Sequence, residues 1–298
     1  MLEKLNAFLR IVIASLLLAV NSVVHILPLL LVALIKLIFR FGPVTRSCDR
    51  ILAAIAASWI GFNSWLFDHL TSTQIEVEGL PETDLQGQLL VVCNHQSWVD
   101  IPVLQKLFNR RLPLLRFFLK SQLIWVPLLG LAWWALDFPF MKRYSREQIE
   151  RRPELAGRDI AATRRACRKF RDIPVAIVNF VEGTRFTRAK HNAQSSPYQQ
   201  LLKPRAGGTA FTLDAMGDAL DTLIDVTIAY PDGRPTLADL FANRIGRIRV
   251  HVRRLPIPEQ LRGRDYRDDP EFRRSIQDWI NRLWAEKDAT LERLRAAE

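Results

Sequence analysis

The sequence predicts an α/β domain, with a mainly parallel central sheet covered by helices, behind an N-terminal membrane-embedded helical segment. Two long uncharged stretches dominate the first 70 residues. Beyond them, short apolar runs end abruptly in polar loops, as expected for strands that are buried on both faces of a parallel sheet. Helical patterns separate these runs, which favours alternating strands and helices. We therefore divide the chain into membrane helices at residues 1–70 and a second domain at residues 71–298.

The first uncharged stretch is residues 11–35. As a helix it would extend about 37 Å, which exceeds the ~30 Å hydrocarbon core of a bilayer. Pro28 is expected to kink or break it. Residues 51–67 form the second stretch, so the two predict either one tilted span with an interfacial helix or a hairpin that dips into one leaflet. A signal peptide is disfavoured, because the apolar run is long and no small-residue cleavage site follows it.

Charge indicates the partner and the orientation. The 298 residues carry a net charge of +11, which favours anionic headgroups or nucleic acid. The tryptophans lie in apolar stretches and not among the basic residues, so we expect membrane lipids as partners and no nucleic acid. Four basic residues follow the first apolar stretch and two precede it: Lys36, Arg40, Arg46 and Arg50 against Lys4 and Arg10. This asymmetry predicts a second domain on the cytoplasmic side.

The elements of the second domain follow in order. The expected strands are residues 74–79 and 88–94, the buried first part of residues 174–185 before their polar loop, and residues 223–231 and 247–255, the last as an edge or late strand. The expected helices are residues 146–171, 207–216 and 269–295, and the last of these is amphipathic with a core-facing apolar stripe. Residues 123–136, "LIWVPLLGLAWWAL", are too short to span a bilayer. They predict a buried helix or a membrane-docking surface with tryptophans at headgroup level, and we favour the second.

The stretch "NHQSWVD", residues 94–100, stands where a buried strand ends. Ligands of parallel sheets bind beyond such strand ends. His95 and Asp100 would point about 140° apart on one helix, so they can face each other only if His95 lies on the loop and Asp100 in the first helical turn. Asp100 would then fix the tautomer of His95, whose other nitrogen could take a proton from a hydroxyl. The chain has no matching serine or cysteine motif, which points to a hydroxyl of the substrate. A purely structural histidine is the alternative, and Cys93 is expected in the core.

A second polar loop, "VEGTR" at residues 181–185, follows another buried strand and should lie at the same edge of the sheet. Thr184 and Arg185 supply donors that suit a phosphate, and arginine can bind one with two hydrogen bonds. The stretch "FPFMKR", residues 138–143, ends another apolar run on basic residues, and Lys120 lies near it in sequence. Together these side chains predict an anion-binding site beside His95.

These motifs resemble those of the glycerophospholipid acyltransferase family, whose members acylate lysophosphatidic acid and its relatives. "NHQSWVD" matches the first family motif, NHxSxxD, and "VEGTR" matches the third. "FPFMKR" resembles the second motif, "VTIAYP" the fourth, and "LLKPRAGG" the Lys-Pro segment that follows the third. The resemblance covers residues 80–231 and is greatest to bacterial inner-membrane paralogues of the 1-acyl-sn-glycerol-3-phosphate acyltransferases.

The resemblance implies roles for individual residues. His95 would be the general base, oriented by Asp100 in the HX4D motif. The glycerol phosphate would be bound by Arg143, Glu182, Gly183, Thr184 and Arg185. Lys120 is a further phosphate candidate, in a stretch where Gln122 replaces the usual glutamate.

The reaction implied is transfer of a fatty acyl chain from acyl-CoA or acyl carrier protein to the sn-2 hydroxyl of lysophosphatidic acid. The product would be phosphatidic acid, an intermediate of phospholipid biosynthesis, made at the cytoplasmic side of the inner membrane. No metal is expected, since the His, Asp and Glu residues lack the spacing of metal ligands. The alternatives are remodelling of other lysophospholipids, acylation of glycerol 3-phosphate, and a non-catalytic membrane-anchored lipid-binding protein. The intact His95 and Asp100 disfavour the last.

Overall fold

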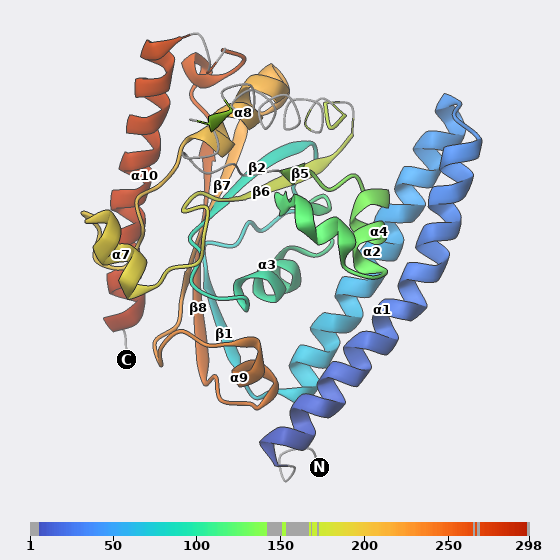
Figure 1. Cartoon of the computed structure of the whole chain (residues 1–298). Helices are drawn as coiled ribbons and strands as arrows, with labels where there is room; N and C mark the ends of the chain where they lie inside the picture. Colours follow the sequence, from blue (N-terminus) through green and yellow to red (C-terminus); the bar gives the residue numbers. More distant parts are fainter. Residues whose placement is uncertain are drawn as a thin grey trace.

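The computed structural model describes residues 6–141, 151–152, 167, 169–171, 173–264, 266 and 269–296. A pair of long helices stands beside a twisted sheet that carries helices on both faces (Figure 1). The predicted helix at residues 146–171 lies mostly outside the described residues, as do Lys142 and Arg143.

The long helices are α1 (Ala7–Ile38) and α2 (Gly42–Leu70), which run side by side as a hairpin (Figure 1). Pro28 lies inside α1 without ending it. Each helix is long and apolar enough to cross a membrane. Polar contacts join the pair, because the Asn21 side-chain amide donates to the Trp59 carbonyl at 3.1 Å and to Asn63 Oδ1 at 2.8 Å. The two apolar stretches therefore pair with each other, as the hairpin alternative expects.

The main sheet has the strand order β1-β8-β7-β2-β6-β3. Its strands are β1 (Gln74–Glu78), β2 (Gln88–Cys93), β3 (Leu115–Phe117), β6 (Val175–Phe180), β7 (Thr222–Ala229) and β8 (Arg247–Pro256). Neighbouring strands are parallel except for β7 and β8. The prediction of a mainly parallel sheet is confirmed. The last strand, β8, lies between β1 and β7 and is not an edge strand, because β1 pairs along its other side.

Both faces of the central strands are buried. Along β2, Leu90 and Val92 pack into one core cluster, and Val91 and Cys93 pack into another on the opposite face. Successive side chains of a strand point to opposite faces, so a strand covered on both sides needs a continuous apolar run. The helices that complete the fold are α3 (Asp100–Phe108), α4 (Leu129–Ala135), α7 (Arg188–Gln194), α8 (Gly207–Met216), α9 (Leu237–Phe241) and α10 (Pro270–Ala296), with short 3₁₀ turns η2 (Ser121–Trp125), η4 (Gly217–Ala219) and η5 (Glu259–Leu261).

Helix α10 covers one face of the sheet, and its apolar stripe is buried as predicted. A buried ion pair also joins it to the sheet. Lys287 Nζ lies 2.5 Å from Asp225 Oδ1 on β7 and donates to the Val226 carbonyl at 2.6 Å. Arg253 on β8 contacts the other oxygen of Asp225 at 2.6 Å. The buried carboxylate of Asp225 is therefore compensated by the positive charges of Lys287 and Arg253.

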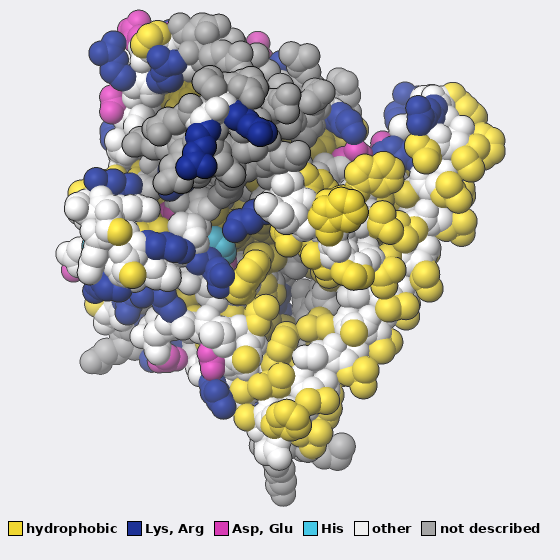
Figure 2. All heavy atoms as spheres, viewed as in Figure 1, with side chains coloured by type: hydrophobic (Ala, Val, Ile, Leu, Met, Phe, Trp, Pro, Cys, Tyr) yellow, Lys and Arg dark blue, Asp and Glu magenta, His cyan; other side chains and the backbone are white. Residues whose placement is uncertain are grey.

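The stretch 123–136 combines both predicted roles. Its helix α4 packs Ala132 and Ala135 against the hairpin, in a cluster with Ile26, Leu29 and Leu52. Trp125, by contrast, is 85% exposed and Trp134 is 54% exposed. Hydrophobic side chains cover the hairpin and the neighbouring part of this face, whereas basic side chains gather over the sheet domain (Figure 2). The apolar hairpin and these tryptophans indicate association with a membrane.

Candidate active site

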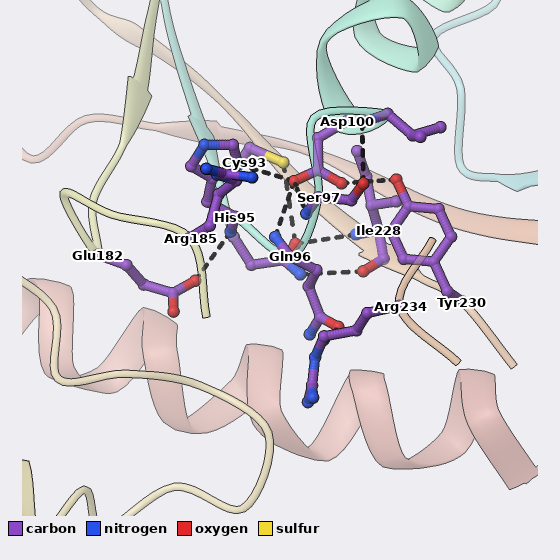
Figure 3. A network of polar contacts seen from close by, with 12 residues as sticks. Cys93, His95, Gln96, Ser97, Asp100, Glu182, Arg185, Ile228, Tyr230 and Arg234 are labelled. Atoms are coloured by element: carbon purple, nitrogen blue, oxygen red, sulfur yellow. Dashed lines mark hydrogen bonds and ion pairs between the residues drawn. The ribbon is translucent and has the colours of Figure 1, made fainter. Parts of the chain in front are cut away.

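The site is built on the turn between β2 and α3 (Figure 3). The strand ends at Cys93, His95 lies on the loop, and Asp100 is the first residue of the helix. His95 Nδ1 lies 2.8 Å from Asp100 Oδ2. The predicted loop-to-helix boundary therefore brings the two side chains together. A carboxylate only accepts hydrogen bonds, so Nδ1 carries the proton and the lone pair stands on Nε2.

Asp100 is fully buried, and its oxygens accept several hydrogen bonds. The backbone N–H groups of Gln96 and Ser97 donate to Oδ2 at 2.7 and 2.9 Å. The hydroxyl of Tyr230, from the end of β7, donates to Oδ1 at 2.6 Å. A buried carboxylate with this many donors is well stabilised and held in one orientation. Asp100 therefore orients the imidazole, and His95 Nε2 has no partner among the described residues.

The imidazole also rests on an aromatic wall. The rings of His95 and Phe180 stack with centroids 4.0 Å apart, and Phe117 stacks on Phe180 at 6.0 Å. Phe180 ends β6, and Phe117 ends β3. The parallel strands thus place both rings at the same edge of the sheet as His95, and this contact sets the plane of the imidazole.

Glu182 follows β6 and is fully buried beneath the turn. Its Oε1 accepts from the backbone N–H of His95 at 2.8 Å, and its Oε2 accepts from that of Leu202 at 2.9 Å. Burial raises the pKa of Glu182 to about 8, against the lowering effect of the two backbone hydrogen bonds. Both oxygens of Glu182 accept hydrogen bonds from backbone N–H groups and hold the loops around the turn. Its position supports a positioning role.

The rest of the "VEGTR" loop lies around the same turn. Gly183 has φ of 70°, a conformation that favours glycine, which allows the tight reversal after β6. Thr184 Oγ1 accepts from Lys190 Nζ at 2.8 Å. Arg185 is exposed, with its guanidinium 4.5 Å from the centre of the Trp98 ring. The backbone N–H of Phe186 donates to the His95 carbonyl at 2.8 Å, so the two predicted polar loops do meet at one edge of the sheet.

The remaining predicted basic residues are less closely tied to the site. Lys120 is exposed at the end of β4 (Leu119–Lys120), which pairs with β5 (Phe140–Met141). No contact joins its side chain to His95 or Asp100 within the described part of the chain. Arg143 follows β5 and lies outside the described residues.

Three contacts that the sequence analysis missed connect β7 and its following loop to the turn. The Asn94 amide exchanges two 2.9 Å hydrogen bonds with the backbone of Ile228. Ser97 Oγ donates to the Pro235 carbonyl at 2.5 Å, and Tyr230 contacts Asp100 as described above. The signal for Tyr230 was present, since it ends a buried apolar run at the same edge of the sheet.

Cys93 is buried in the core, as predicted. Burial raises the pKa of its thiol well above the ordinary value, so the reactive thiolate is disfavoured. The arrangement is thus an α/β sheet that presents a carboxylate-oriented imidazole with a free nitrogen beside exposed basic side chains. Such a site can take a proton from a hydroxyl of a bound anionic molecule.

Comparison with known proteins identifies the family. The sequence model of the family described as Acyltransferase matches residues 74–230, from β1 to Tyr230. The chain belongs to the acyltransferase family.

Curated relatives are about a quarter identical to the chain over the residues that align. The probable 1-acyl-sn-glycerol-3-phosphate acyltransferase 5 of Arabidopsis thaliana is 24% identical over 259 residues, covering 83% of this chain and 64% of that protein. The 1-acyl-sn-glycerol-3-phosphate acyltransferase epsilon of Mus musculus is 26% identical over 251 residues, covering 76% of this chain and 63% of that protein. The chain thus spans a little under two thirds of the length of these relatives.

A solved structure has the same fold. The 1-acyl-sn-glycerophosphate (LPA) acyltransferase PlsC from Thermotoga maritima aligns with a TM-score of 0.52 over 97% of this chain and 99% of that one. At 17% identity, this similarity concerns the fold alone.

Proposed function

We propose that the chain is a membrane-bound O-acyltransferase that acylates the sn-2 hydroxyl of lysophosphatidic acid and forms phosphatidic acid. The acyl donor is a thioester, acyl-CoA or acyl carrier protein. The observation that carries this proposal is the 2.8 Å contact between His95 Nδ1 and the buried Asp100, which leaves Nε2 available as a base. The names of the relatives support the choice of acceptor.

The mechanism follows from this geometry. His95 Nε2 takes the proton of the acceptor hydroxyl while the hydroxyl oxygen attacks the thioester carbonyl. Asp100 stabilises the imidazolium that forms. When the tetrahedral intermediate collapses, the C–S bond breaks, and the imidazolium returns its proton to the leaving thiolate. General-base assistance of this kind is typically worth ~10²–10⁴ in rate.

Binding of the acceptor phosphate places the hydroxyl near the base. Arg185 and Thr184 follow β6 beside the His95 turn and suit this role, and Lys120 and Arg143 are proposed with them. An anchored phosphate converts the attack into an effectively intramolecular step, which supplies part of the rate. The apolar hairpin would hold the site at the cytoplasmic face of the inner membrane, where both acyl chains can enter from the bilayer.

The test is acyl transfer by the detergent-purified full chain. Wild type and His95→Ala are offered oleoyl-CoA, or an oleoyl thioester of acyl carrier protein, with lysophosphatidic acid or lysophosphatidylcholine. We expect phosphatidic acid from wild type, and a rate at least about 10²-fold lower from the variant. His69→Ala serves as the matched control, because this histidine lies in the last turn of α2 and its ring contacts Trp65. Preference for lysophosphatidylcholine would contradict the proposed acceptor, and full activity of His95→Ala would contradict the proposed base.

A further inference from the structure

Two arginines from distant parts of the chain converge on one amide oxygen. Arg295 Nη1, in the last turns of α10, donates to Gln200 Oε1 at 3.0 Å. Arg234 Nη2, in the loop after β7, lies 3.4 Å from the same oxygen. Asp288 accepts the backbone N–H groups of Gln199 and Gln200 at 2.7 and 2.9 Å, which fixes the segment that carries the shared amide.

Arg234 and Arg295 lie next to the His95 turn. Arg234 Nε donates to Gln96 Oε1 at 3.2 Å, and Gln96 is the residue after His95. The Arg234 guanidinium also stacks on Phe186, 3.8 Å from the ring centre, and the Phe186 N–H donates to the His95 carbonyl. An amide oxygen and an aromatic face therefore hold the Arg234 side chain in one orientation.

The two guanidinium groups have like charges. Among the described residues, no carboxylate forms an ion pair with Arg234 or Arg295. Arg188, exposed in the first turn of α7, adds a third positive charge. The pKa of Arg234 is lowered, first by burial and then by the charges of Arg295 and Arg188, whereas the charge of the acidic Glu182 side chain raises it against their effect. Both oxygens of nearby Asp288 are already engaged by backbone donors.

Two guanidinium groups repel each other, an anion bound between them removes this repulsion, and their planar forks match phosphate oxygens. We propose that Arg234 and Arg295, bridged by Gln200, form a second phosphate site, which binds the phosphopantetheine phosphate of the acyl donor. This inference rests on the proposed acyl transfer, and it names where the donor is held.

The position of the pair favours the donor over the acceptor. In Figure 3, Arg185 lies beside the His95 ring, whereas Arg234 lies past the Gln96 side chain, farther from that ring. Both substrates of the proposed reaction are anionic. One phosphate site on each side of the His95 turn allows both to be bound together, with the thioester and the hydroxyl meeting between them.

The experiment measures binding directly, so that it does not depend on turnover. Detergent-purified full chain is titrated calorimetrically with coenzyme A and, separately, with acyl carrier protein that carries phosphopantetheine. The proteins are wild type, the double variant Arg234→Gln/Arg295→Gln, and Arg293→Gln. Arg293 is the matched control, because it lies on the same turn of α10 and pairs with Glu78 instead.

We expect the Kd of coenzyme A, of the carrier protein, or of both to rise at least about tenfold in the double variant and to stay within about twofold in Arg293→Gln. The ligand whose binding falls is the donor that uses the site. In the transfer assay, the double variant should raise the KM of that donor and leave the KM of lysophosphatidic acid unchanged. Donor binding equal to that of wild type, no binding to any of the proteins, or a higher KM for lysophosphatidic acid alone would overturn the inference. Absence of acyl transfer with donor binding still dependent on the two arginines would instead count against the proposed function.

Discussion

Tyr230 donates its phenolic hydrogen to Asp100 Oδ1 over 2.6 Å, although the two residues are 130 positions apart in the chain. Both side chains are buried. Because of this contact, the orientation of Asp100 depends on the end of β7, a strand whose sequence is otherwise typical of a buried core. Burial raises the pKa of the Tyr230 phenol well above its usual range, so the hydroxyl remains a donor at neutral pH.

Replacement of Tyr230 by Phe should therefore impair the site without removing the base. The variant leaves Asp100 Oδ1 buried with one donor fewer, which should lower the free energy of unfolding by about 1–3 kcal/mol. We expect kcat to fall several-fold, while the KM for the acceptor changes little. Chemical denaturation and steady-state transfer assays check both effects. Tyr198→Phe is the control, because that hydroxyl donates to the Asn281 carbonyl and does not contact Asp100. An unchanged kcat in Tyr230→Phe would show that the Asp100 orientation does not need this contact.

The raised pKa of Glu182 predicts a pH dependence of stability. Its folded-state pKa of about 8 lies above the ordinary value of 4.5, so the folded state holds this proton more tightly than the unfolded state. The contribution of Glu182 to the free energy of unfolding should then fall as pH rises between these two values, with a maximal slope of roughly 1.4 kcal/mol per pH unit.

Glu182→Gln tests this dependence, because an amide does not titrate. The variant also places an NH₂ group against one backbone N–H, so it should be less stable than wild type at pH 5 by about 1–3 kcal/mol. Between pH 5 and pH 8, wild type should lose more stability than the variant, as measured by denaturant unfolding in detergent. Equal losses in the two proteins would mean that Glu182 is ionised in the folded state across this range.

The exposed tryptophans beside the hairpin should contact lipid. Trp125 and Trp134 are exposed next to the apolar helices, and tryptophan is enriched at the bilayer interface. In vesicles of brominated phospholipid, Trp125→Phe and Trp134→Phe should each remove part of the quenching of the intrinsic fluorescence. Trp279→Phe should leave the quenched fraction nearly unchanged, since Trp279 is buried under the sheet. If all three variants are quenched alike, this surface does not lie against the membrane.

The buried ion pair under α10 predicts a stability effect. Lys287→Met leaves Asp225 in the core with Arg253 as its remaining ionic partner. Breaking a buried pair typically costs 3–5 kcal/mol, and the remaining contact to Arg253 should keep the loss near about 3 kcal/mol. Arg293→Gln, also on α10, breaks an exposed pair with Glu78 of β1 and should have little effect. Comparable midpoints of denaturation for the two variants would contradict this account of how α10 is held.

Much of the fold could be predicted from local patterns. The continuous apolar runs at β2, β6 and β7 predicted strands buried on both faces, because only a strand covered on each side needs apolar residues at successive positions. The position of β8 could not be predicted in this way. Its alternating pattern is typical of an edge strand, yet β1 pairs along its outer side. Strand order depends on pairing between distant segments, which periodicity does not encode.

The same division holds at the site. The sequence by itself determined that His95 lies on the loop after a strand and that Asp100 lies in the first turn of the next helix. A chain that passes from strand to loop to helix within a few residues has few conformations available. Only the tertiary structure decided which groups surround this pair. The Glu182 carboxyl accepts hydrogen bonds from backbone N–H groups, and Tyr230 donates to Asp100. Arg234 and Arg295 both contact the side-chain oxygen of Gln200. These contacts join residues far apart in the chain, so they exist only once the parallel strands have brought their carboxyl ends to one edge of the sheet.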